Sequence, residues 1–192
     1  MMILGSHNSW SYLPPRKWWM RPIAFTARCQ SADIRKQYEL GVRCFDIRIR
    51  FTDEGRMVIA HGIVEYKVSG AELYRDLRWI DEQGDCYVRI LHEARNERQY
   101  TKFYASLFHD LCKNIEVIRG HIHWWCGRNL YNWEKDYDFG DDPKCDEKYG
   151  SVSGKKWLYG WWPWLYARLH NREIREQGTD NDILLIDYVD IK

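Results

Sequence analysis

Polar and apolar side chains alternate along residues 42–51, the sequence VRCFDIRIRF, which is typical of a β-strand. The alternation places Cys44, Asp46, Arg48 and Arg50 on one face, with phenylalanine and isoleucine on the other. An apolar strand face of this kind packs against helices. We therefore expect the polar face to point into a barrel interior or toward its mouth.

Shorter apolar runs predict further strands at residues 2–6, 57–61, 86–93 and 182–190. Between the first run and the next pattern, residues 10–30 contain three prolines and are expected to form a long loop.

Helical patterns separate the predicted strands. A helix is expected from Ser31, which is a fair N-cap, to Gly41, which can adopt the left-handed conformation that ends a helix. A second helix begins at a capping box made by Ser69 and Glu72 and runs to about Ile80.

An amphipathic helix is expected at residues 100–111, and a further helix at residues 164–176. Residues 117–154 are rich in aromatics, aspartate and glycine without a clear period, and should form loops with one or two short strands. Alternation of strands and helices implies parallel strands with helical crossovers. We predict an α/β fold with a single domain, residues 1–192, built as a compact or irregular TIM-type (β/α) barrel, shorter than the ~250 residues typical of such barrels.

Composition and charge narrow the classes of partner. The chain has 29 basic and 28 acidic residues, so its net charge of +1 gives no broad attraction to nucleic acid. Its six cysteines form no CxxC pair that would indicate a structural metal site. No cleaved leader or membrane-spanning stretch is visible, so we expect a cytoplasmic chain or one released without a cleaved signal. We also expect a monomer.

Residues that could supply acid–base catalysis or a fixed charge lie at the ends of the predicted strands. They are His7, Arg48, His61, Glu93 and Asp187. In a (β/α) barrel the chemistry collects where strands end and loops begin, so these side chains should converge. Two imidazoles and a fixed cation supply the base, the acid and the charge stabilisation that displacement at phosphorus needs.

The runs GSHNSW, GVRCFDIRIR and AHG resemble the X region of phosphatidylinositol-specific phospholipases C. The resemblance is clearest over residues 3–93 and returns at the last strand, LLIDYV. It implies a distorted barrel in which an inositol 2-hydroxyl attacks the adjacent phosphodiester, releasing diacylglycerol and leaving a cyclic inositol phosphate. The substrate would be a phospholipid or an inositol phosphate.

The resemblance and elementary chemistry together assign the catalytic roles. His7 would take the proton from the attacking hydroxyl and His61 would protonate the departing oxygen, since the pKa of imidazole is near ~6.5. Arg48 would hold the phosphoryl oxygens as charge builds on them. Asp187 resembles the family's carboxylate that fixes the tautomer of the base. Asp46 shares a strand face with Arg48, so it can orient that arginine or, in the metal-using branch, bind an ion.

The chain departs from both branches of the family. Asn8 stands where simple bacterial enzymes have an aspartate, and its amide can orient His61 without stabilising a charge there. The calcium-dependent eukaryotic enzymes have asparagine and three carboxylates, of which Asp46 and Glu93 match two while Arg48 replaces the third. A guanidinium there would repel a divalent cation. We therefore favour a reaction without a cofactor, in which Asn8 and Glu93 contact the substrate. If Ca²⁺ is used, its ligands would be Asn8, Asp46 and Glu93.

The run Arg16-Lys17-Trp18-Trp19-Met20-Arg21 follows the first strand and should lie at the rim of the active face. Basic residues next to tryptophan suit a lipid headgroup boundary, so peripheral membrane contact through Trp18 and Trp19 is expected. The run Trp161-Trp162-Pro163-Trp164 would either form a second such patch or pack over the barrel.

Two alternative functions stay open. A glycerophosphodiester phosphodiesterase-like barrel also uses histidines at strand ends, but it depends on a carboxylate pair and a metal. A catalytically weak module would keep the phosphate pocket and only bind a lipid or inositol phosphate, and Asn8 favours that alternative. The fold alone does not choose among them.

Overall fold

The computed structural model describes residues 2–93, 161–177 and 183–191. It also describes short segments at residues 106–107, 110–111, 113–114, 123–128, 136–140 and 147–148. The helix expected at residues 100–111 lies mostly outside the described residues, as does most of the predicted loop region of residues 117–154.

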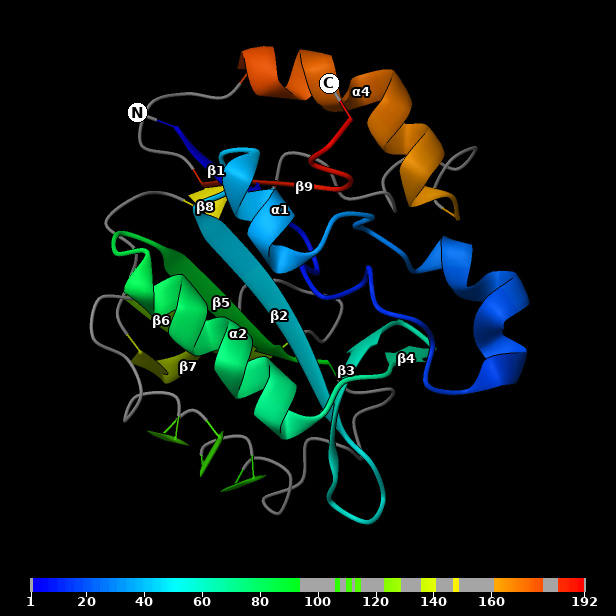
Figure 1. Ribbon diagram of the computed structural model, residues 1–192, viewed down its shortest axis with the longest axis vertical. Helices are drawn as coiled ribbons and strands as arrows, with labels where there is room; N and C mark the ends of the chain where they lie inside the picture. Colours follow the sequence, from blue (N-terminus) through cyan, green and yellow to red (C-terminus); the bar gives the residue numbers. More distant parts are fainter. Residues whose placement is uncertain are drawn as a thin grey trace.

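A curled sheet forms the centre of the molecule (Figure 1). Its parallel strands follow the spatial order β6 (His123–Arg128), β5 (Tyr87–His92), β2 (Cys44–Phe51), β1 (Ile3–Ser6), β9 (Ile183–Ile186) and β8 (Glu147–Lys148). β7 (Asp136–Gly140) pairs antiparallel with β6. Among the described strands the sheet is an open half-barrel, which confirms the predicted α/β class and irregular barrel.

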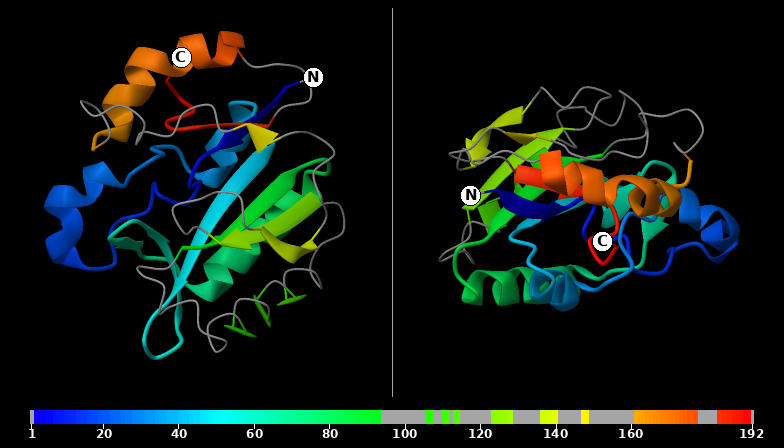
Figure 2. Two further views of the ribbon diagram at one scale, coloured as in Figure 1. Left: turned by 180° about the vertical axis from the view of Figure 1, so that it is seen from behind. Right: turned by 90° about the horizontal axis from the view of Figure 1, so that it is seen from above.

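Strand β2 carries the core on its apolar face. Phe45, Ile47 and Ile49 are fully buried and belong to one hydrophobic cluster with Leu73 and Leu77 of α2 (Gly70–Glu82). Helices α1 (Ile34–Glu39) and α2 lie together on this side of the sheet (Figure 2). The polar face of β2 is buried as well, which confirms the alternation predicted from the sequence.

Strand β1 lies between β2 and β9, and a glycine allows this close packing. Gly5 is paired with Cys44 on one side and with Leu185 on the other. A Cβ atom at Gly5 would collide with the Leu185 side chain. The same register pairs Ser6 with Ile186, the last residues of the two strands. The residue that follows each strand therefore lies next to the other.

The helix boundaries agree in part with the predictions. The capping box of Ser69 and Glu72 is present at the start of α2, and α4 (Pro163–Gln177) covers the range predicted for the last helix. The N-cap of α1 is Asp33, whose side chain accepts from Lys36 N, so the assignment to Ser31 was wrong. The Ser31 hydroxyl instead bonds to a carboxylate near the C-terminus.

Three predicted segments differ from the structure. β3 (Met57–His61) runs antiparallel to β2 and forms a hairpin with β4 (Val64–Tyr66), because the turn from β2 is too short for a parallel crossover. The expected loop of residues 10–30 contains a 3₁₀ helix, η1 (Trp18–Thr26). β9 ends at Ile186, earlier than expected, because the chain turns at Tyr188, whose φ is 48°.

None of the helices in the described parts of the chain is both long enough and apolar enough to cross a bilayer.

Candidate active site

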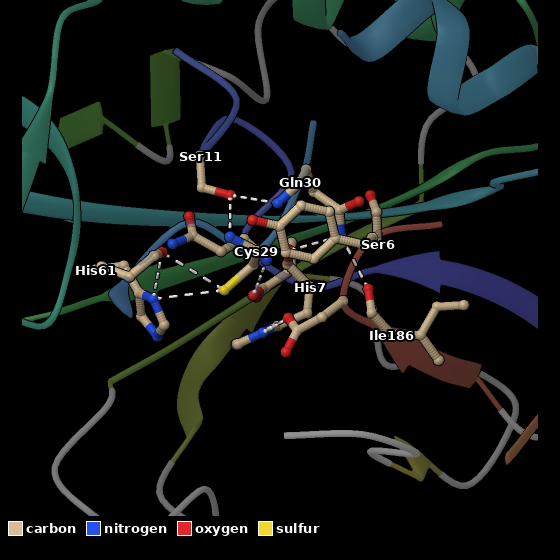
Figure 3. Close-up of polar contacts among 12 residues, drawn as sticks. Ser6, His7, Ser11, Cys29, Gln30, His61 and Ile186 are labelled. Carbon is tan, nitrogen blue, oxygen red and sulfur yellow. Dashed lines mark hydrogen bonds and ion pairs between the residues drawn. The ribbon is translucent and has the colours of Figure 1, made fainter. Parts of the chain in front are cut away.

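His7 and Asp187 form a buried pair at the ends of β1 and β9. The distance between His7 Nδ1 and Asp187 Oδ1 is 2.6 Å. Because the carboxylate accepts this hydrogen bond, Nδ1 of His7 carries the proton and Nε2 keeps the lone pair. The Gln30 amide holds both strand ends by donating to the carbonyls of His7 at 3.0 Å and Ile186 at 2.8 Å (Figure 3).

His61 approaches this pair from the end of β3. Its ring centroid lies 5.3 Å from that of His7, and the two rings are perpendicular. Nδ1 of His61 lies 2.9 Å from the carbonyl oxygen of Ala27, to which it donates. The expectation that Asn8 orients His61 was wrong, because among the described residues the Asn8 amide has no hydrogen-bond partner. A backbone carbonyl therefore holds the ring.

Arg48 is fixed between two buried carboxylates. Its Nε lies 3.0 Å from Asp46 Oδ2, and its Nη1 lies 3.2 Å from Glu93 Oε2. Asp46 also accepts from the backbone N of Asn8 at 3.0 Å and lies 3.6 Å from Nη1 of Arg89. Asp46 thus orients Arg48, which is the first of the two arrangements expected from the sequence.

Glu93 connects the arginine to the hairpin that carries His61. One carboxylate oxygen of Glu93 accepts from the backbone N of Gly62, the residue that follows His61. Arg50 reinforces this link, because it donates to the carbonyl oxygens of Glu93 at 3.0 Å and Gly62 at 2.5 Å. The position of the His61 ring is therefore coupled to that of the Arg48 guanidinium.

The calcium ligands considered above do not fit a divalent cation in this arrangement. The guanidinium of Arg48 donates to both Asp46 and Glu93, so a positive group already lies between the two carboxylates. Asp46 and Glu93 also accept hydrogen bonds from backbone N–H groups. A hard cation would have to displace these donors and face the guanidinium charge.

Burial and the arginine charge set the protonation states of the site. Burial, followed by the charge of Arg48, lowers the pKa of His7 to about 3, although Asp187 acts in the opposite direction. Burial also lowers the pKa of His61, against the effect of Glu93. Burial opposes the charge on Arg48, but Asp46 and Glu93 outweigh it and raise the pKa of the guanidinium. At neutral pH the site therefore holds two neutral imidazoles and one cation.

Cys29 is the residue of the site that the sequence interpretation missed. Its Sγ lies 3.5 Å from Nδ1 of His61 (Figure 3), and its side chain is fully buried. The Ser11 hydroxyl accepts from the Cys29 backbone N at 2.9 Å, and Cys29 O accepts from Tyr188 N at 2.6 Å. These contacts are non-local, and no motif around Cys29 signals them in the sequence.

Comparison with known proteins identifies the fold. No family model and no curated protein matches the sequence. In three dimensions the chain is similar to phosphatidylinositol-specific phospholipase C from Listeria monocytogenes, with a TM-score of 0.64 and 15% identity over 97% of this chain and 87% of that protein. The F249X mutant of the Staphylococcus aureus enzyme gives a TM-score of 0.62 and 15% identity over 97% and 85%.

The chain has the fold of the bacterial phosphatidylinositol-specific phospholipases C. This confirms the resemblance noted in the sequence at the level of the fold. At 15% identity the likeness concerns architecture, so the chemistry must be argued from the residues of this chain.

Proposed function

We propose that this protein is a phosphodiesterase of the phosphatidylinositol phospholipase C type, cleaving an inositol phosphodiester by acid–base catalysis through a cyclic inositol phosphate. The observation that carries the proposal is the pair of perpendicular imidazoles 5.3 Å apart, one of them held by Asp187, beside the fixed guanidinium of Arg48. The fold of the bacterial enzymes supports it.

In the first step His7 acts as the general base. Its Nδ1 proton is held by Asp187, so Nε2 is the atom that accepts the proton of the inositol 2-hydroxyl. The ring is neutral before the reaction, and Asp187 stabilises the imidazolium that forms. A bound phosphodiester anion offsets the charge of Arg48, which raises the pKa of His7 from about 3 toward the range useful for catalysis.

His61 protonates the departing oxygen. The carbonyl of Ala27 holds Nδ1–H of His61, so the ring, neutral in the free site, takes up a proton from solvent at Nε2 as the phosphodiester anion binds and then delivers it to the departing oxygen. The carboxylate of Glu93 favours that charged form, in opposition to burial. Hydrolysis of the cyclic intermediate would use the same two groups in reversed roles.

Arg48 and Asn8 would contact the phosphate and the inositol ring. The guanidinium neutralises charge that develops on the phosphoryl oxygens, and it is already held in place by Asp46 and Glu93. Asn8 has a φ of 46°, and its buried amide finds no hydrogen-bond partner in the described residues. A buried amide without a hydrogen bond lowers the stability of a protein. We therefore assign a substrate oxygen as the hydrogen-bond partner of the Asn8 amide.

The direct test uses the purified chain with phosphatidylinositol vesicles and phosphorus NMR of the soluble products. We expect a cyclic inositol phosphate, formed at the same rate with and without EDTA. Turnover of glycerophosphodiesters that stops on adding EDTA would favour the metal-dependent alternative. Vesicle binding without any product would favour the binding module.

An exposed aromatic surface supports peripheral membrane contact. Trp18 and Trp19 in η1 are 73% and 57% exposed, and Lys17 lies 6.0 Å from the Trp19 ring centroid. Phe25 of η1 contacts Trp162 at 6.0 Å between centroids, and Trp161 beside it is 78% exposed. We propose that these residues insert at the headgroup boundary of anionic lipid.

Replacing both Trp18 and Trp19 with alanine should weaken binding to anionic vesicles roughly tenfold or more, which corresponds to about 1.4 kcal/mol. Turnover of a soluble inositol phosphodiester should not change. Trp79→Leu is the matched control, because Trp79 lies in α2, on a different part of the molecule from η1 (Figure 1). Equal vesicle binding by the double variant and the unaltered protein would exclude this membrane surface.

A further inference from the structure

The side chains of His7, Cys29 and His61 form a cluster with the composition of a transition-metal site. One ring nitrogen of each histidine and the Cys29 sulfur all lie within 4.8 Å of one another. We propose that this cluster binds Zn²⁺ or a similarly soft divalent cation, and that the bound ion inhibits the enzyme. The inhibition rests on the function proposed above, whereas the binding does not.

The spacing of the three side chains suits one tetrahedral ion. With Zn–N bonds of ~2.0 Å and a Zn–S bond of ~2.3 Å, ligand atoms lie roughly 3.3–3.6 Å apart. The Cys29 sulfur and the Nδ1 of His61 are already 3.5 Å apart. The other distances in the cluster reach at most 4.8 Å, so the two rings must move toward the sulfur for all three side chains to bind one ion.

The surroundings of His7 match those of a zinc-bound histidine. Metal-binding histidines donate their second ring N–H to a carboxylate or a backbone carbonyl, which fixes the tautomer and raises the basicity of the ligand nitrogen. Asp187 does this for His7, at 2.6 Å from Nδ1, and so leaves Nε2 as the ring nitrogen that can bind the ion. His61 would bind through Nδ1, so its hydrogen bond to the carbonyl of Ala27, 2.9 Å away, is lost on metal binding and the ring carries its proton on Nε2 instead.

This site differs in its ligand atoms from the calcium site considered above, which would use Asn8, Asp46 and Glu93. A thiolate and two imidazoles favour Zn²⁺, Co²⁺ and Cd²⁺, whereas Ca²⁺ and Mg²⁺ require oxygen ligands. On binding, the Cys29 thiol loses its proton to solvent and a metal–sulfur bond forms, while the neutral imidazoles release none. The ion thus adds one net positive charge, next to the carboxylate that accepts the hydrogen bond from His7.

A metal held in this way would stop the proposed reaction. His7 and His61 would both be engaged as ligands, so neither ring could accept or deliver a proton. His7 and Cys29 are buried while His61 is only partly so, which makes the His61 side the entry path for the ion.

The test of binding uses Co²⁺ as a spectroscopic probe for the Zn²⁺ site. We expect the full-length protein to show thiolate-to-cobalt charge-transfer absorption that Zn²⁺ abolishes by competition. Cys29→Ser should lose the absorption of one site and bind Co²⁺ at least about 100-fold more weakly there. Cys86→Ser is the matched control, because Cys86 is equally buried but packs in the hydrophobic core. Identical absorption in Cys29→Ser and the unaltered protein would overturn the proposal.

A second variant keeps the test decisive if Cys29→Ser does not fold. Asp187→Asn leaves all three ligands in place but weakens the bond that orients His7, so Co²⁺ affinity should fall about 10- to 100-fold with the sulfur absorption retained. An unchanged affinity would contradict the site.

An activity assay then separates this inference from the proposed function. We expect Zn²⁺ to inhibit turnover reversibly, with EDTA restoring it and Ca²⁺ having no effect. Cys29→Ser should require at least about 100-fold more Zn²⁺ for half inhibition, measured against its own metal-free rate. A cobalt site without phosphodiesterase activity would refute the function alone. Activity without a Cys29-dependent cobalt site would refute the metal site alone.

Discussion

Replacing His7 with alanine should lower the turnover of phosphatidylinositol by about 10³-fold, because the attacking hydroxyl then loses its general base. Alanine also leaves Asp187 buried without the Nδ1–H that it accepts at 2.6 Å. Circular dichroism should confirm that the variant is folded. His170→Gln, in the helix α4, is the control histidine and should keep full activity. Activity of His7→Ala within tenfold of the unaltered protein would rule out this base.

The two histidines can be distinguished by the leaving group of the substrate. His61→Ala should lose about 10²- to 10³-fold with phosphatidylinositol, whose alkoxide must be protonated as it departs. With a nitrophenyl ester of inositol phosphate the defect should shrink to a few-fold, since that leaving group needs no proton. The His7→Ala defect should stay large with both substrates. Equal defects of His61→Ala on the two substrates would remove His61 from the role of acid.

Part of the site could be predicted from the sequence because the functional residues of a (β/α) barrel lie where its strands end. The alternation of residues 42–51 predicted the buried polar face that carries Asp46 and Arg48, and the structure has it. The pairing of His7 with Asp187, separated by 180 residues, follows from parallel strands ending at the same edge of a sheet. Local pattern and one topological rule were sufficient for these contacts.

The rest of the site depends on contacts that no local pattern encodes. His61 comes from an antiparallel hairpin, although the expected strand order was parallel. The carbonyl of Ala27 and the thiol of Cys29 meet His61 because the segment after η1 folds back over the site. Backbone carbonyls carry no sequence signature, and a single cysteine in a loop is most often a small buried residue. The positions of the Ala27 carbonyl and the Cys29 thiol next to His61 could therefore be seen only in the folded structure.

Arg48→Gln should combine a large loss of activity with a large loss of stability. Without the cation, turnover should fall about 10²- to 10³-fold, as expected when a group that stabilises developing charge is removed. The carboxylates of Asp46 and Glu93 would remain buried with their main partner gone, which should cost about 3–5 kcal/mol in the free energy of unfolding. Urea denaturation measures this loss of stability. Arg48→Lys keeps a charge but not the planar fork, so its activity and its free energy of unfolding should lie between those of Arg48→Gln and the unaltered protein.

Calcium then tests whether the guanidinium stands in the place of a metal ion. In Arg48→Gln the two carboxylates and the Asn8 amide are left facing a site from which the positive group has been removed, so millimolar Ca²⁺ should raise the melting temperature of the variant. It should not raise that of the unaltered protein, where Arg48 donates to both carboxylates. Stabilisation of the unaltered protein by Ca²⁺ would show that the ion and the guanidinium bind together, and would contradict a metal-independent site. A variant insensitive to Ca²⁺ but destabilised as expected would instead mean that Asp46 and Glu93 serve only to hold the arginine.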